Sequence, residues 1–112
     1  GLKDKSLTLD LDRLCAIRAR VTVPLVLHGS SGVTNEHIAD GIKLGLCKIN
    51  VATQLNKAFT GAVRDVLAAD DALVDPRKYL GPARDAQIEA VRERLRFLGA
   101  SGCARLAEAG TS

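Results

Sequence analysis

Two short segments carry the residues that could do chemistry, and each comes directly after an apolar run. His28 precedes Gly29-Ser30-Ser31-Gly32, and Asn50 precedes Val51-Ala52-Thr53. An imidazole can bind a metal or carry a proton. Glycines let a backbone approach a ligand closely, and successive amides at the start of a helix attract an anion such as phosphate. Together the two segments predict an anion site beside a histidine.

The apolar runs that position these segments indicate buried strands of a parallel sheet. Leu25-Val26-Leu27 is apolar at successive positions, as in a strand covered on both faces, and Pro24 fits only at the start of such a strand. The second strand is expected from residue 46 to residue 50 or 51. Ligands of α/β proteins collect at the carboxyl ends of parallel strands, which is where His28 and Asn50 fall.

Helices are expected on either side of both strands. Asp10 can cap a short helix that ends in Arg18 and Arg20, and Thr34 can cap the next, which Gly45 ends. The clearest helical spacing comes after Thr53, with apolar residues at Leu55, Ala58, Phe59, Ala62, Val63, Val66 and Leu67. The resulting order is helix, strand, helix, strand, helix, helix, which implies a parallel sheet.

The last third of the chain is expected to contain a break. Asp75-Pro76 starts a short turn or helix, and Gly81-Pro82 interrupts it before a final helix over residues 83–98. That helix is expected to bury the stripe Ile88, Val91, Leu95 and Leu98. Residues 1–8 are expected to be loose, and residues 99–112 to form a flexible tail.

Composition excludes several classes of protein. Apolar residues make up 46% and charged residues 26% of the 112 residues, which is ordinary for a folded domain. A net charge of +3 with 3% aromatics gives no stacking surface for nucleic acid, and no apolar run is long enough to cross a membrane or serve as a secretory signal. The cysteines Cys15, Cys47 and Cys103 are odd in number, so we expect them to be reduced, in the cytoplasm, with Cys15 and Cys47 in the core.

A lone histidine has two interpretations. His28 is either a hydrogen-bonded structural residue or a zinc ligand, and a catalytic zinc needs about three protein ligands. The other histidine, His37, is expected on the surface of a helix.

Three stretches taken together resemble the C-terminal part of the class II, zinc-dependent ketose-bisphosphate aldolases. They are residues 24–32, residues 45–53 and the Asp75-Pro76-Arg77-Lys78-Tyr79-Leu80 segment. The resemblance runs from about Leu7 to Cys103. It implies an α/β fold in which residues 1–112 are part of a (β/α)8 TIM barrel, namely strands 7 and 8 with their helices.

The resemblance also implies roles for individual residues. His28 corresponds to the last of three zinc-binding histidines, and Asn50 to a catalytic residue near the enediolate. The phosphate of dihydroxyacetone phosphate would be held by Gly29, Ser31, Asn50, Val51, Ala52 and Thr53. The implied cofactors are Zn²⁺ and a monovalent cation, Na⁺ or K⁺. The implied complete enzyme is a homo-oligomer, a dimer or tetramer, with neither nucleic acid nor membrane as partner.

The implied reaction is cleavage of a ketose 1,6-bisphosphate, fructose or tagatose, to dihydroxyacetone phosphate and glyceraldehyde 3-phosphate, a step of carbohydrate metabolism such as glycolysis.

Two residues depart from the family pattern. Ser30 stands where the family usually has glycine, and serine would be strained there if the position needs a positive φ. Asn56 stands where many members carry a basic residue for the second phosphate, with Lys57 beside it.

The other two zinc histidines and the acid-base aspartate of the family belong to earlier strands. We therefore expect the isolated 112-residue chain to be inactive as an aldolase. The alternatives are a stand-alone sugar-phosphate-binding module and an inactive truncated fragment.

Overall fold

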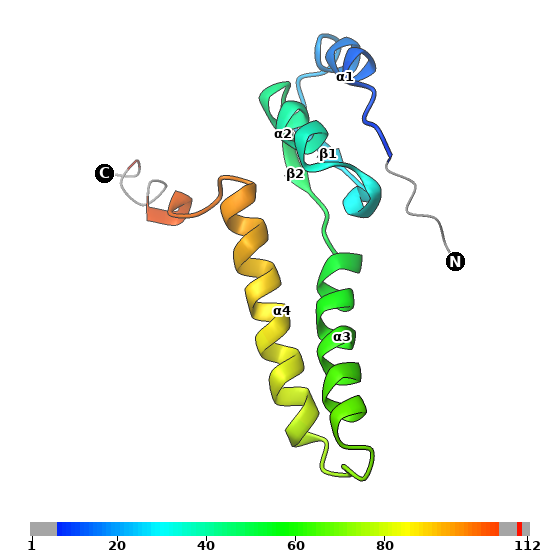
Figure 1. The fold of residues 1–112 in the computed structure, drawn as a ribbon. Helices are drawn as coiled ribbons and strands as arrows, with labels where there is room; N and C mark the ends of the chain where they lie inside the picture. The colour runs from blue at the N-terminus through cyan, green and yellow to red at the C-terminus, as the bar shows by residue number, and fades with distance from the viewer. Residues whose placement is uncertain (1–6, 106–109, 111–112) are drawn as a thin grey trace. The chain divides into compact units, whose positions relative to one another are not determined.

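A computed structural model describes residues 7–105 and residue 110, and Figure 1 shows the order of the elements. The chain divides into two compact units, Gly1–Ala52 and Thr53–Ser112. The expected order of helix, strand, helix, strand, helix, helix is confirmed, with one added 3-10 turn. The first unit contains α1 (Leu11–Arg18), β1 (Leu25–Leu27), η1 (Ser30–Gly32), α2 (Asn35–Lys43) and β2 (Leu46–Ile49).

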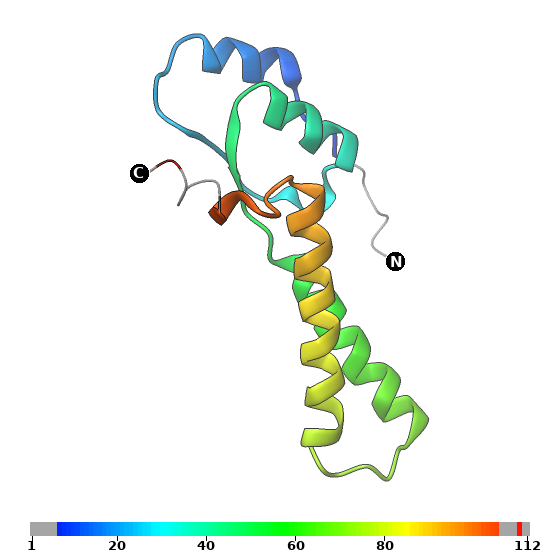
Figure 2. The ribbon, with the colours of Figure 1, turned by 90° about the vertical axis from the view of Figure 1, so that its left-hand side faces the viewer.

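The helices of the first unit begin where their capping residues predict. The Asp10 carboxylate accepts a hydrogen bond from the Arg13 amide at 2.8 Å, and the Thr34 hydroxyl accepts one from the His37 amide at 3.4 Å. Gly45 has a φ of 112°, which only glycine adopts readily, so it ends the α2 segment as expected. The two helices contact each other, as Figures 1 and 2 show.

β1 and β2 form the expected parallel pair, with Leu25 opposite Leu46 and Leu27 opposite Ile49. The small core beside them is aliphatic: Ile38 is 2% exposed, Leu46 7% and Leu14 8%. Gly41 permits this close packing, because a Cβ there would stand 2.7 Å from Leu46 Cδ1. α2 is therefore held tightly against the sheet that carries the two polar strand ends.

Leu7 is more ordered than the sequence suggests. Residues 1–6 of the expected loose segment lie outside the described residues. Leu7, by contrast, forms a parallel bridge with Val33, and its amide donates to the Gly32 carbonyl at 2.7 Å. The expectation of a loose segment is wrong at this residue.

The sheet is open where full burial is expected. Val26 is 41% exposed, although its apolar run predicts a strand covered on both faces. Cys15 and Cys47, expected in the core, are both exposed, as is Cys103. The reason is that the first unit has too few strands and helices to cover both faces of its two-stranded sheet and the outer side of α1.

The second unit contains α3 (Thr53–Ala69) and α4 (Arg77–Phe97), which lie side by side (Figure 1). Thr53 is the first residue of α3. The expected break at Gly81-Pro82 is absent, because α4 continues through Pro82. Proline removes one backbone donor near the start of the helix, and packing against α3 accompanies the continuous form: Ala83, next to Pro82, is fully buried.

The side of α4 that is buried differs from the expected one. Ile88, Val91 and Leu95 are 41%, 37% and 46% exposed, whereas the small side chain of Ala83 has no exposed area. Small residues let two helices approach closely, and the more buried side of α4 includes Ala83, Ala86 and Ala90. Of the expected stripe, only Leu98 is half-buried. Among the described residues, no helix combines the length and apolarity that a membrane span requires.

Of the expected tail over residues 99–112, residues 106–109, 111 and 112 lie outside the described residues. The preceding turn is hydrogen-bonded: the Ala100 amide donates to the Leu95 carbonyl at 2.9 Å, and the Cys103 amide donates to the Ala100 carbonyl at 3.2 Å. The flexibility of the tail stays a prediction.

Asp75 lies two residues before the start of α4 and pairs with Arg77, the first residue of that helix. Its carboxylate accepts from Arg77 Nη2 at 2.8 Å and from the Arg77 amide at 3.0 Å. The side-chain bond and then the backbone bond lower the pKa of Asp75. A lowered carboxyl pKa means that the stabilisation is complete above the pKa of the unfolded chain and is lost as pH falls through the folded pKa.

We expect Arg77→Gln to raise the pKa of Asp75, because the charged donor is removed while the backbone donor stays. An NMR titration of the Asp75 carboxyl carbon measures this directly. Arg64→Gln, on α3, is the control and should leave the Asp75 titration in place. An Asp75 pKa that does not move in Arg77→Gln would contradict the role of the ion pair.

Candidate functional site

His28 comes directly after β1 and is exposed. The chain then turns through Gly29, whose φ of 67° lies in the left-handed region, into the short turn η1. A residue with a Cβ would be strained at that φ by about 1–2 kcal/mol, although there is open space around the position. The glycine is therefore required by the backbone that leads away from the histidine.

Asn50 comes directly after β2 and is held by three hydrogen bonds to the first loop and its strand. Its amide donates to the Leu27 carbonyl at 3.0 Å, and its carbonyl accepts from Ser30 Oγ at 2.7 Å. Its side-chain Nδ2 lies 2.8 Å from His28 Nδ1. The two strand ends expected to meet are thus joined, and one residue makes all three connections.

Ser30 does not have the strain that its place in the family pattern suggested. The positive φ belongs to Gly29, and no described residue other than glycine has one. Ser30 is 6% exposed, and its hydroxyl is satisfied by the Asn50 carbonyl. Sequence reasoning missed this contact; the only signal was the departure of Ser30 from the family glycine.

The remaining residues proposed for phosphate lie around this junction. Gly29, Ser31 and Ala52 are exposed, and Val51 is half-buried. All belong to the first unit. Thr53 belongs to the second unit, and its part in the same site stays a prediction.

His37 is not the simple surface residue that was expected. It is half-buried, and its Nδ1 accepts a hydrogen bond from the Leu9 amide at 3.2 Å. That contact ties the segment before α1 to α2. A structural role is thereby assigned to His37, which leaves His28 as the histidine at the strand ends.

The described residues do not make up a complete zinc site. Within residues 7–105 and 110, no group of three or more His, Cys, Asp or Glu side chains comes together. A catalytic zinc takes about three protein ligands, so His28 can supply one at most. A catalytic zinc at His28 would therefore need further ligands from outside the described residues.

The hydrogen bond between His28 and Asn50 determines whether a ring nitrogen of His28 is free to bind a metal. With Asn50 Nδ2–H donating to Nδ1, the proton of a neutral ring is on Nε2. Turning the Asn50 amide by half a rotation would place its Oδ1 against Nδ1–H and free Nε2. Metal-binding histidines commonly donate their second ring N–H to an oxygen in this way.

We expect the purified 112-residue chain to retain no stoichiometric zinc after dialysis, since one imidazole cannot hold the ion. Elemental analysis of the dialysed chain gives the metal content, and the His28→Ala chain provides the comparison. One zinc retained per wild-type chain, and lost in His28→Ala, would contradict the expectation.

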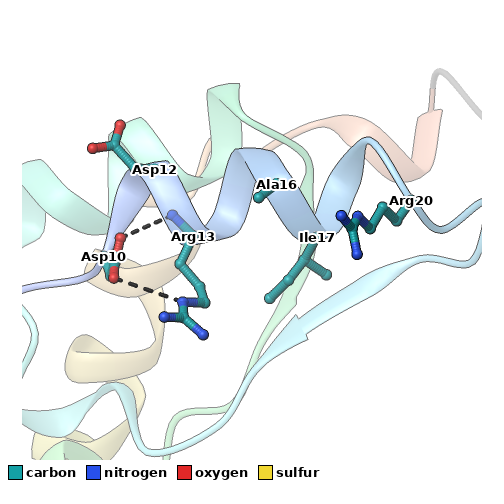
Figure 3. Close-up of a pocket in the computed structure, with 6 residues that line it drawn as sticks. All are labelled: Asp10, Asp12, Arg13, Ala16, Ile17 and Arg20. Carbon is teal, nitrogen blue, oxygen red and sulfur yellow. Dashed lines mark hydrogen bonds and ion pairs between the residues drawn. The ribbon is translucent and has the colours of Figure 1, made fainter.

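A surface depression on α1 is separate from these residues. It is lined by Asp10, Asp12, Arg13, Ala16, Ile17 and Arg20. Figure 3 shows Asp10 bonded to Arg13 across it. None of the residues proposed for the site lines it, and the Asp10 carboxylate is engaged in capping the helix.

A parallel pair of strands flanked by helices is typical of α/β proteins, in which ligands commonly collect at the carboxyl ends of the strands. The chain belongs to the class II fructose-bisphosphate aldolase family. Residues 1–103 match the family described as fructose-bisphosphate aldolase class-II, which is nearly the whole chain.

A solved structure shows the same relationship. The chain is similar to the YdjI aldolase from Escherichia coli K12, with 30% sequence identity and a TM-score of 0.71. The similarity covers 87% of this chain and 36% of that one. The fold is thus similar to that of an aldolase, and the chain spans little more than a third of the length of that aldolase.

Proposed function

We propose that these residues are the phosphate-binding part of a class II aldolase that cleaves a ketose 1,6-bisphosphate, fructose or tagatose. The products would be dihydroxyacetone phosphate and glyceraldehyde 3-phosphate. The observation that carries the proposal is the set of hydrogen bonds by which Asn50 joins the two strand-end loops. It occurs in a chain of the aldolase family, at the two loops that the family resemblance assigns to substrate.

The open sheet supports placing residues 1–112 in a (β/α)8 barrel as strands 7 and 8. A parallel pair normally lies within a larger sheet that is covered on both faces. Val26 and Cys47 are exposed here on strands whose apolar residues suit a core. Further strands of a barrel would pair with the free edges and cover these side chains.

The phosphate of the substrate would bind the backbone of the two loops. Gly29 and Ser31 would contact it from the first loop, and Val51, Ala52 and Thr53 from the second. Backbone amides and the start of a helix favour an anion. A phosphate held at this edge would place the reacting carbons next to Asn50 and His28, and such positioning is a large part of catalysis.

His28 would supply one of three imidazoles to a zinc ion whose other ligands lie on other strands. When bound, that ion would act as a Lewis acid on the substrate carbonyl. The Asn50 side chain would orient the His28 ring through Oδ1 and donate a hydrogen bond from Nδ2 to the enediolate oxygen. Oriented polar groups of this kind stabilise charge without reorganising during the reaction.

The wider setting of the enzyme is taken from the family resemblance. We place it in the cytoplasm, as a dimer or tetramer, with Na⁺ or K⁺ as a further cofactor. The roles of Asn56 and Lys57 toward the second phosphate stay open. Both line one depression on α3, together with Thr53, Thr60 and Arg64.

A stand-alone sugar-phosphate-binding module is the second candidate. The observation that favours it is that hydrogen bonds within residues 7–105 alone join the two loops. Such a module would bind dihydroxyacetone phosphate and turn nothing over.

The test is a cleavage assay on a complete enzyme, meaning a polypeptide in which residues 1–112 are joined to the remaining strands of a barrel. Fructose 1,6-bisphosphate and tagatose 1,6-bisphosphate are supplied separately, and dihydroxyacetone phosphate is measured. We expect cleavage of at least one, lost on treatment with a chelator and restored by zinc. Cleavage of neither, by a folded and zinc-loaded enzyme, would contradict the proposal.

A further inference from the structure

Ser30 is the one buried polar side chain among the described residues. It lies in the turn between the two exposed residues Gly29 and Ser31, so its burial is not a consequence of a buried loop. A buried hydroxyl needs a hydrogen-bond partner, and Ser30 Oγ finds it in the Asn50 carbonyl at 2.7 Å. The contact crosses from the first loop to the second.

The hydrogen bond to the Asn50 carbonyl also controls the start of the second loop. The Asn50 carbonyl and the Val51 amide belong to one planar peptide group, so a bond that fixes the carbonyl also fixes the direction of the Val51 N–H. The Asn50 amide is fixed as well, by the Leu27 carbonyl at 3.0 Å. Both peptide groups of Asn50 are thereby anchored to the first strand and its loop.

We propose that Ser30 is a positioning residue that makes the two loops bind phosphate as one site. The proposal rests on the proposed function, in which these loops bind the substrate phosphate, and deepens it. Without the hydroxyl, the Asn50 amide stays bonded to Leu27 and each loop could still contact an anion, but no hydrogen bond would fix the direction of the Val51 N–H relative to the first loop. The advantage of two contacts made by one prearranged site would then be lost.

The size of the effect depends on the bond that is removed. A neutral hydrogen bond contributes about 0.5–1.5 kcal/mol net, which corresponds to a change of about 2–12-fold in an equilibrium constant. We expect Ser30→Ala to weaken binding of dihydroxyacetone phosphate to the 112-residue chain within this range. Fold stability should fall by a similar amount, so loss of affinity alone does not identify the role.

The decisive measurement is an amide NMR titration with dihydroxyacetone phosphate, read at both loops. In the wild-type chain, the amides of Gly29 and Ser31 and those of Val51 and Ala52 should saturate with one common dissociation constant. In Ser30→Ala the two loops should give different dissociation constants, or only one should respond. A merely structural role would weaken binding at both loops equally, so that their dissociation constants would remain equal.

Two further variants keep the test decisive. Ser30→Gly restores the residue that the family usually has and supplies a second variant without the hydroxyl if Ser30→Ala does not fold. Thr22→Ala removes an exposed hydroxyl from the same unit and should titrate like the wild type. Equal dissociation constants at the two loops of a folded Ser30→Ala or Ser30→Gly chain would overturn the proposal for Ser30. They would not contradict the proposed function. A wild-type chain whose loops do not respond would instead contradict the phosphate site itself.

Discussion

In the complete enzyme, His28→Ala should reduce kcat/KM for ketose bisphosphate cleavage to the level of wild-type enzyme stripped of metal. Removing one of about three imidazoles leaves a catalytic zinc with too few protein ligands. His28 is exposed at the end of β1, so its replacement removes no core contact. The loss should therefore appear in activity and in zinc content measured together, with the melting temperature of the metal-free protein unchanged.

His37→Ala is the matched control for this variant. It removes the other histidine of the chain and the acceptor of the Leu9 amide, so it should lower stability while activity at moderate temperature remains. Full cleavage activity in His28→Ala would remove His28 from the metal site. Loss of activity with normal zinc content would instead assign it a role other than ligation.

Asn50→Ala should lower kcat/KM of the complete enzyme by about 10–100-fold, the usual range for a residue that orients a metal ligand. The substitution removes the side chain that lies 2.8 Å from His28 Nδ1 and keeps both backbone hydrogen bonds of the residue. We therefore expect kcat to fall while the melting temperature changes little. Steady-state kinetics and thermal unfolding of the same preparation separate the two.

Asn50→Asp sharpens the interpretation of that result. The carboxylate has the same shape and can still accept from His28 Nδ1–H, but it adds a negative charge where a phosphate is proposed to bind. We expect KM to rise more in Asn50→Asp than in Asn50→Ala. Unchanged kinetics in both variants would show that Asn50 takes no part in the reaction.

Local signals in the sequence were sufficient for the element order and for the residues at the strand ends. Asp10 and Thr34 cap the helices that their spacing predicts, because capping depends on residues three apart in the chain. The apolar runs predicted the strands, and the strand ends placed His28 beside Asn50. The caps and strands depend on short-range rules, and the meeting of His28 and Asn50 follows from the general rule that the ends of paired parallel strands lie together; both are confirmed.

Predictions that depended on packing were less successful. The apolar stripe of α4 predicted burial of Ile88, Val91 and Leu95, whereas the helix packs through Ala83. Pro82 predicted a break that a continuous helix accommodates. Which side of a helix is buried depends on its neighbours, and the periodicity of one helix does not identify them.

The contacts within the site could not be read from residue types. Serine at position 30 suggested strain, but the positive φ lies one residue earlier, at Gly29, and the hydroxyl of Ser30 binds the second loop. Hydrogen bonds between the two loops, which are far apart in the chain, depend on the pairing of β1 with β2. They become visible only once the register of the strands is known.

The ends of β1 and β2 are proposed to form a phosphate site on this chain, and every role assigned to the two loops depends on that site. An amide NMR titration of the 112-residue chain with dihydroxyacetone phosphate, beside one with dihydroxyacetone, tests it most directly. We predict saturable shifts at Gly29, Ser31, Val51 and Ala52 with the phosphate ester and none with the parent sugar. Equal shifts with both compounds, or shifts confined to other residues, would contradict the site.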